Sequence, residues 1–155
     1  MEAVLYRIDE RLIHGQVMVA WIANTGANSV VIVDEESSKD DFMIQVFQLA
    51  APKNIKVMVA DAKGFRDLLQ EKDDYKAIVL FKGPINAHEA LREVAAGELI
   101  VGNVSSNPQR KKYTQYAYFS ENEKELLQEL QSAGWKVNMQ LLPDAHKNEF
   151  KNDTN

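Results

Sequence analysis

Short hydrophobic runs alternate along the chain with longer segments in which apolar residues recur at helical spacing. The run at residues 29–33, Ser-Val-Val-Ile-Val, is continuous, which is typical of a strand covered on both faces in a parallel sheet. Residues 135–142 alternate apolar and polar positions, which predicts a last strand with one wetter face. Together the runs predict strands at residues 3–8, 29–33, 55–60, 76–81, 98–104, 113–119 and 135–142.

Helices are predicted between most of these strands. Val17, Ala20 and Trp21 follow Gly15 at helical spacing, and Gly26 is well placed to end that helix in a left-handed conformation. The other helices are expected at residues 39–51, where Phe42, Val46 and Leu49 share helical spacing after a capping serine, after the capping residue Asp61, at residues 87–96, and after the capping box at residues 120–123.

This order of elements predicts an α/β fold. Strands separated by single helices are joined by right-handed crossovers, so we expect a single-domain open, mostly parallel twisted sheet of about seven strands with helices on both faces. The short connection between residues 104 and 113 would let one late strand run antiparallel. The domain is expected to span residues 1–145, followed by a polar tail at residues 146–155 that frays.

In open parallel sheets, ligands bind outside the carboxyl ends of the strands. That rule selects four loops, at residues 9–15, 34–37, 82–84 and 103–110. The first holds two carboxylates, an arginine, a histidine and a glycine. The other loops contribute side chains that could line the same site: Asp34, Lys82, Ser105 and Arg110.

His14 is the side chain of the first loop that can act as a nucleophile near neutral pH, because a neutral imidazole has a free lone pair. A phosphoryl group on His14 would meet the unpaired N–H groups of Gly15 and Gln16 and the positive end of the following helix. Arg11 offers a planar, two-pronged contact to phosphate oxygens. Asp9 could hold the imidazole tautomer or orient Arg11.

Other interpretations stay open on the residue types alone. A loop histidine is more often a structural or solvated residue, and residues 9–11 more often form a salt-bridge cluster at a helix entrance. A non-catalytic α/β domain could bind an anion or a sugar phosphate in the same crevice. An acid–base enzyme could use Asp9 and His14 as a pair, although a second nucleophile or an oxyanion motif is missing from the sequence.

Composition excludes several classes of function. A net charge of −5 disfavours nucleic acid as a partner. The sequence has no cysteine and its three histidines, His14, His88 and His146, are far apart, so neither a metal site nor a disulfide is expected. Neither a glycine-rich nucleotide motif, nor a signal peptide, nor a membrane-spanning run is recognisable. No cofactor is therefore expected.

The eleven residues at 7–17, Arg-Ile-Asp-Glu-Arg-Leu-Ile-His-Gly-Gln-Val, resemble the N-terminal signature of a known family. It is the IIB component of the mannose/fructose/sorbose family of the bacterial sugar phosphotransferase system. Trp21, the Val-Val-Ile-Val-Asp-Glu of residues 30–35, the Ala51-Pro52 pair and the length of 155 residues are similar too. The resemblance covers nearly the whole chain.

The resemblance implies a cytoplasmic phosphocarrier, a protein-N(π)-phosphohistidine–sugar phosphotransferase subunit associated with a membrane permease. The histidine at the position of His14 would accept a phosphoryl group on Nδ1 from a phosphohistidine of the IIA partner. It would then pass the group to a sugar imported through the IIC/IID membrane components, with the residue matching Arg11 contacting the phosphoryl group. The sugar and the oligomeric state, including a homodimer, are left open.

The chain departs from the family pattern in one loop. Members often carry Asn-Val-Gly-Gly after the fifth strand, whereas here the stretch is Asn-Val-Ser-Ser at residues 103–106, followed by Arg110 and Lys111. No role is carried over to Ser105 or Ser106.

Overall fold

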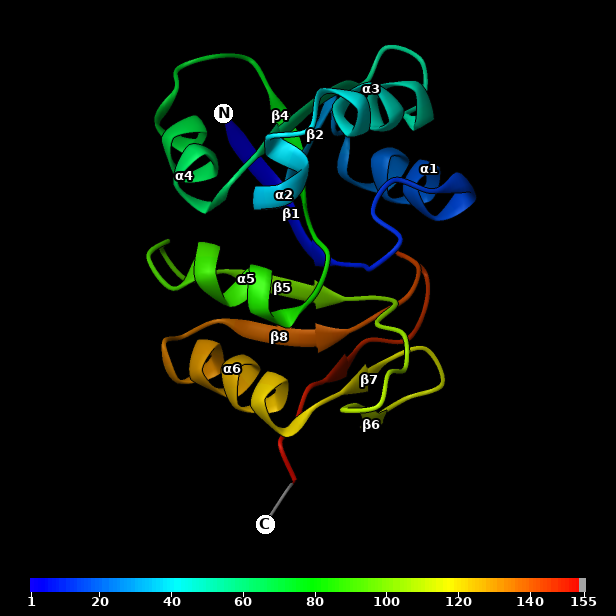
Figure 1. The fold of residues 1–155 in the computed structure, drawn as a ribbon, viewed down its shortest axis with the longest axis vertical. Coiled ribbons are helices and arrows are strands. Elements are labelled where there is room, and N and C mark those ends of the chain that lie inside the picture. Colours follow the sequence, from blue (N-terminus) through cyan, green and yellow to red (C-terminus); the bar gives the residue numbers. More distant parts are fainter. Residues whose placement is uncertain (154–155) are drawn as a thin grey trace.

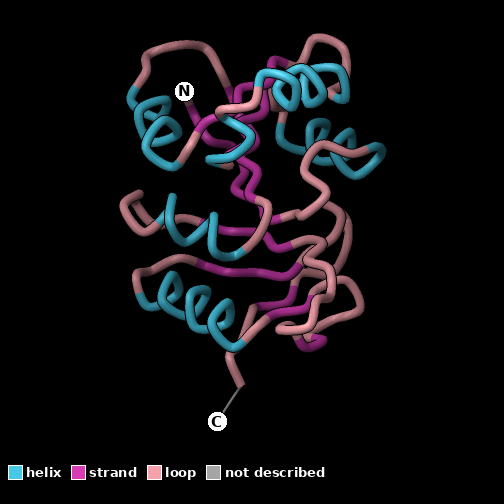
Figure 2. The backbone as a smooth tube through the Cα atoms, viewed as in Figure 1, coloured by secondary structure: helices cyan, strands magenta, loops and turns pink. Residues whose placement is uncertain are grey.

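The continuous run at residues 29–33 forms β2 (Ser29–Val33), and all five of its residues are buried. In the computed structural model, which describes residues 1–153, β2 lies inside a sheet that crosses the middle of the molecule (Figures 1 and 2). The sheet order is β3 (Lys56–Ala60), β2, β4 (Lys76–Phe81), β1 (Glu2–Ile8), β5 (Glu98–Val101), β8 (Lys136–Met139) and β9 (Asn148–Glu149).

Helices cover both faces of this sheet, as the sequence predicted (Figure 1). The pairs from β3 to β8 are parallel, and only β9 pairs antiparallel within the described part of this sheet. Among residues 1–153 no helix is both long and apolar enough to cross a bilayer. One face carries α1 (Gly15–Thr25) and α3 (Asp41–Ala50), and the other carries α4 (Ala62–Gln70), α5 (Pro84–Leu91) and α6 (Glu121–Ser132).

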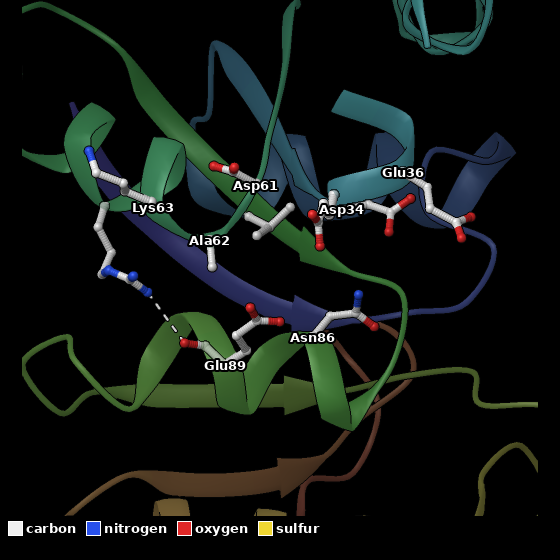
Figure 3. Close-up of a pocket in the computed structure, with 10 residues that line it drawn as sticks. Asp34, Glu36, Asp61, Ala62, Lys63, Asn86 and Glu89 are labelled. Atoms are coloured by element: carbon white, nitrogen blue, oxygen red, sulfur yellow. Dashed lines mark hydrogen bonds between the residues drawn. The ribbon is translucent and has the colours of Figure 1, made fainter. Parts of the chain in front are cut away.

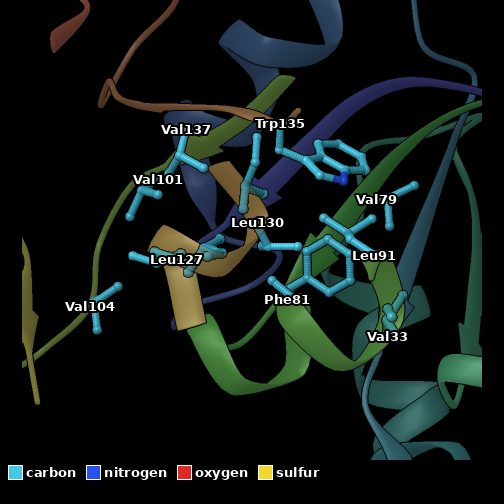
Figure 4. Packing of buried hydrophobic residues seen from close by; sticks show 14 of the residues in the cluster. Val33, Val79, Phe81, Leu91, Val101, Val104, Leu127, Leu130, Trp135 and Val137 are labelled. Carbon is cyan, nitrogen blue, oxygen red and sulfur yellow. The ribbon is translucent and has the colours of Figure 1, made fainter. Parts of the chain in front are cut away.

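Alternate residues of β2 feed two separate hydrophobic cores. Val31 and Val33 pack in the cluster under α4, α5 and α6, while Val30 and Ile32 pack in the cluster under α1 and α3. Figure 4 shows the first cluster, where Trp135 lies among aliphatic side chains from the strands and from α5 and α6. Burial on both faces explains why the hydrophobicity of the run is continuous.

The predicted strand at residues 113–119 is wrong over most of its length. Within it, β7 (Tyr118–Phe119) pairs antiparallel with β6 (Lys111–Lys112) in a separate two-stranded sheet, and Ala117 makes a single parallel bridge to Val104. The Thr114 hydroxyl oxygen accepts hydrogen bonds from the backbone N–H groups of Tyr116 and Ala117, which folds residues 114–117 into a turn. The aromatic residues of this segment suggested a strand. They are present because they pack on the core, and this packing does not require an extended backbone.

The polar tail does not fray as expected. β9 pairs with β8, and Phe150 is 1% exposed, in contact with the rings of Tyr113 and Phe119. One buried aromatic residue in a polar context was too weak a signal to predict this packing. Residues 154 and 155 of the predicted tail lie outside the described residues.

The predicted helix at residues 39–51 is α3 (Asp41–Ala50), but it is capped by Asp40 and not by a serine. Both serines of the preceding loop lie instead in a short helix, α2 (Glu35–Ser38), which the carboxylate of Asp34 caps. Helix α5 begins earlier than the predicted 87–96, because Pro84 fits its first turn, where a missing N–H costs nothing. It also ends earlier, at Leu91.

Helix α3 turns a different face to the sheet from the one that its spacing indicated. Phe42, Val46 and Leu49 are 71%, 38% and 87% exposed, whereas Phe47 is 8% exposed and Met43 packs beside it. The helix carries two apolar stripes, and periodicity alone does not say which of them packs on the strands.

Replacing Phe47 by alanine should therefore lower the free energy of unfolding by about 3 kcal/mol, since it leaves a cavity in the core under α3. Leu49→Ala, on the exposed stripe of the same helix, should change it by less than about 0.5 kcal/mol. Urea unfolding of both variants measures this difference. Equal losses, or a larger loss for Leu49→Ala, would contradict packing of α3 through Phe47.

Candidate functional site

The loop at residues 9–14 is held at the carboxyl end of β1 by the strands on either side. The Asp9 N–H donates to the Phe81 carbonyl at the end of β4, and the Glu10 N–H donates to the Asn103 carbonyl beyond β5. The Leu12 N–H donates back to the Asp9 carbonyl and closes a turn. The loop therefore leaves the sheet at the edge where ligands bind in parallel α/β folds.

His14 occupies the N-cap position of α1, and its side chain makes no capping hydrogen bond. Its Nδ1 lies 3.2 Å from the carbonyl oxygen of Leu12. A carbonyl oxygen can only accept, so in the neutral ring the proton is on Nδ1 and the lone pair is on Nε2. Nε2 is enclosed and has no hydrogen-bond partner among the described residues. In this conformation neither nitrogen is free to attack.

The backbone on both sides of the histidine is left-handed. Leu12 has φ = 56°, which is costly for a residue with a Cβ, and its side chain is 5% exposed. Gly15 has φ = 37°, and an added Cβ there would meet nothing within 4 Å. Glycine is thus required at residue 15 by backbone conformation, and the space above it is open. The N–H groups of the first turn of α1, at Gly15 and Gln16, lie in this exposed region.

A buried ion pair lies beneath the loop. Arg7, 1% exposed, donates from Nη1 to the Gln140 carbonyl at 2.9 Å and from Nη2 to the Leu141 carbonyl at 3.0 Å and to Asp9 Oδ2 at 3.2 Å. Its guanidinium carbon lies 5.1 Å from the ring centroid of Trp21. Burial lowers the pKa of Arg7, while Asp9 opposes that shift. The charge is therefore fixed in place by several partners.

Asp9 contacts arginines rather than the imidazole. Its Oδ1 accepts from the Arg11 N–H at 3.1 Å and lies 3.7 Å from Arg11 Nε, while Oδ2 holds Arg7. The Arg11 side chain is 49% exposed. Asp9 was expected either to hold the imidazole tautomer or to orient Arg11, and its contacts fit the second role. The group that contacts Nδ1 of His14 is the Leu12 carbonyl.

Gly102 makes the buried ion pair sterically feasible. A Cβ on this residue would lie 2.2 Å from Arg7 Nη2 and 2.9 Å from Asp9 Oδ2. Sequence reasoning missed both Arg7 and Gly102. The signal available for Arg7 was its position as a charged residue inside the apolar run at residues 3–8. Nothing in the local sequence marked Gly102.

The other predicted site-lining residues fall in two places. Lys82 and Arg110 line a recess of about 220 Å³ together with Glu10, next to the His14 loop. The exposed Ser105 also reaches this loop, because its N–H donates to Glu10 Oε2 at 3.1 Å. Asp34 instead lines a separate cleft of about 380 Å³ between α2, α4 and α5, where its carboxylate also accepts the Ser37 hydroxyl at 2.6 Å (Figure 3).

The residues described contain no group of three or more side chains suited to a metal ion. His88, away from the loop, lies 2.7 Å from the carboxylate of Glu129 in a pair between α5 and α6.

Comparison with known proteins assigns this arrangement to a family. The family model of the PTS system sorbose subfamily IIB component matches residues 3–154. The chain belongs to this family. The fructose-specific EIIB component of Bacillus subtilis (strain 168) is 26% identical over 155 residues, covering 97% of this chain and 94% of that protein. The sorbose-specific EIIB component of Klebsiella pneumoniae is 26% identical over 146 residues, covering 92% and 88%.

Solved structures agree with the fold of this IIB component. The structure of manxB from Thermoanaerobacter tengcongensis has a TM-score of 0.87 and 34% identity, covering 96% of this chain and 92% of that chain. The IIBSor domain of the sorbose permease from Klebsiella pneumoniae has a TM-score of 0.88 and 25% identity, covering 95% and 92%. The α/β class with a mostly parallel sheet is thereby confirmed, and the family resemblance is confirmed with it.

In this IIB component, Gly102→Ala should lower the free energy of unfolding by about 3 kcal/mol, because the new methyl group displaces Arg7 from a buried pair. Gly97→Ala, at the other end of β5, is the matched control. Its Cβ would lie 3.5 Å from the Trp135 ring, an ordinary contact, so a change below about 1 kcal/mol is expected. Urea denaturation measures both, and equal stability of the two variants would contradict the steric role of Gly102.

Proposed function

We propose that this IIB component is a phosphocarrier whose nucleophile is His14. It accepts a phosphoryl group from a phosphohistidine of a IIA component and passes it to a sugar that enters through the IIC/IID membrane components. It would work in the cytoplasm, at the permease. The observation that carries this proposal is the placement of His14 at the N-cap of α1, at the end of the loop that leaves the carboxyl end of β1 and also carries Arg11.

Each transfer exchanges one bond to phosphorus for another. In the first, the lone pair of a His14 nitrogen attacks phosphorus, the P–N bond of the donor breaks, and the donor imidazole keeps the electron pair. In the second, a sugar hydroxyl oxygen attacks, the P–N bond to His14 breaks, and the hydroxyl proton is released. Such transfers depend mainly on positioning and on stabilising the charge of the phosphoryl oxygens.

The family resemblance implies attack through Nδ1, and this requires the imidazole to leave its resting position. Nδ1 must lose its contact with the Leu12 carbonyl, and the ring proton must move to Nε2. Once Nδ1 is free, a phosphoryl group on it would accept hydrogen bonds from the N–H groups at the start of α1. Arg11 would neutralise part of its charge. The open space at Gly15 leaves room for the phosphoryl oxygens.

The resting geometry also favours a second candidate function. With Nδ1 occupied and Nε2 enclosed, the histidine could be a structural residue in a domain that binds an anion or sugar phosphate without reacting. Covalent labelling separates the two functions, because the second predicts saturable binding and no gain in mass.

Incubation with a phosphorylated IIA component should add one phosphoryl group to the wild-type chain, in an acid-labile and alkali-stable linkage. His14→Ala should remain unlabelled because the nucleophile is gone. Intact-mass measurement at neutral and acid pH tests this expectation. His88→Ala is the matched histidine control and should label fully, since His88 lies in the pair with Glu129. Equal labelling of His14→Ala would end the assignment.

Arg11→Lys should slow phosphoryl transfer at least about tenfold and leave the thermal unfolding midpoint within a few degrees of wild type. A lysine replaces a planar two-pronged contact by a single point charge. Rapid-quench kinetics with the phosphorylated IIA component measure the rate. The exposed Arg92→Lys is the control substitution and should transfer at the wild-type rate. An unchanged rate for Arg11→Lys would remove Arg11 from the phosphate site.

A further inference from the structure

Arg110 does not offer a free guanidinium to the recess that it lines. Its Nε donates to Glu123 Oε1 at 2.9 Å and its Nη2 to Glu123 Oε2 at 2.8 Å, a two-pronged contact. Its Nη1 donates to the Ser105 carbonyl at 2.8 Å and lies 3.5 Å from Glu10 Oε1. Two carboxylates thus share one arginine that is only 14% exposed. The guanidinium therefore faces carboxylates of the protein itself and is not free for a ligand in the recess.

Glu123 is a firm anchor for this arginine. It is 4% exposed and stands in the first turn of α6, where its Oε1 also accepts the Ser120 N–H at 2.9 Å in a capping box. The contact with Glu123 raises the pKa of Arg110, so the guanidinium stays charged at neutral pH.

At the other end, Glu10 belongs to the His14 loop itself. Its two oxygens are divided between Arg110 and the Ser105 N–H at 3.1 Å. Partial burial alone would raise the pKa of Glu10, but these hydrogen bonds together lower it, so Glu10 is a carboxylate in the working protein. The result is a continuous chain of contacts from α6 through Arg110 to a residue four positions before His14.

We propose that Arg110, anchored by Glu123, is a positioning residue for the His14 loop: it holds and neutralises the Glu10 carboxylate, which would otherwise repel the incoming phosphoryl group. The inference rests on the proposed function of His14. A phosphoryl group carries two negative charges, and an unpaired carboxylate on the same short loop would oppose its arrival. Arg110 thus acts through Glu10 and does not contact the phosphoryl group, unlike Arg11.

The test compares three variants with two phosphoryl donors. Arg110→Gln should slow phosphorylation of His14 about tenfold, because Glu10 loses its counter-charge. Glu10→Gln with Arg110→Gln should restore the rate to within about threefold of wild type, since the repelling charge is gone. Glu10→Gln alone should stay near wild type. The first donor is the phosphorylated IIA component, and the second is phosphoramidate, a small donor whose P–N bond breaks with release of ammonia.

Arg66→Gln is the matched control. Arg66 likewise binds a carboxylate, that of Glu93 at 3.0 Å, and backbone carbonyls of a helix, but it lies on α4 away from the His14 loop. It should label at the wild-type rate with either donor. High salt should shrink the defect of Arg110→Gln, because ions screen the Glu10 charge.

Each outcome decides between definite alternatives. A wild-type rate for Arg110→Gln, or a double variant as slow as Arg110→Gln, overturns the inference while leaving His14 in place. A defect seen only with the IIA donor would make Arg110 a partner contact and also overturns it. If neither donor labels wild type above His14→Ala, the proposed function fails, and the inference fails with it.

Discussion

The site depends on a positive charge that the fold buries directly beneath it. Transferring an unpaired guanidinium out of water costs far more than the net stability of a small domain. Arg7 is tolerated because Asp9 and the carbonyls of Gln140 and Leu141 surround it. The geometry that satisfies the charge also fixes Asp9, and Asp9 in turn holds the backbone of Arg11. The loop is therefore shaped by the requirement to pair a charge that is itself buried.

This requirement extends across the sheet. Arg7 lies on β1, while its carbonyl partners follow β8, and β5 lies between these two strands. The chain that leaves β5 must pass the guanidinium, and only a residue without a Cβ fits there, which is why Gly102 stands at that point. Trp21 adds a ring face to the cation and donates its indole N–H to the Leu141 carbonyl. The first helix is thereby tied to the same cluster.

Features that depend on neighbouring residues in the sequence could be predicted, whereas features that depend on contacts between distant residues could not. β2 and the position of His14 were predictable because continuous hydrophobicity and a strand–loop–helix order are local patterns. The packed face of α3 was not, since both of its stripes are apolar. Nor were the contacts of Arg7 with residues 140 and 141, or of Ser105 with Glu10, which join positions 133, 134 and 95 residues apart. No local sequence pattern encodes such pairs. The partner of each residue can be identified only when the order of the strands in the sheet is known.

The surroundings of its two ring nitrogens decide how firmly the His14 imidazole is held in its resting position. The hydrogen bond from Nδ1 to the Leu12 carbonyl returns about 0.5–1.5 kcal/mol net, and an enclosed Nε2 without a partner costs about 1–3 kcal/mol. The cost at Nε2 is at least as large as the gain at Nδ1, so the ring is held only weakly in the observed position. Hydrogen bonds to a charged phosphoryl group are about twice as strong as neutral ones. In the proposed phosphorylated form, hydrogen bonds from the N–H groups of α1 and from Arg11 would therefore outweigh the single contact with the Leu12 carbonyl, so turning the ring would cost little.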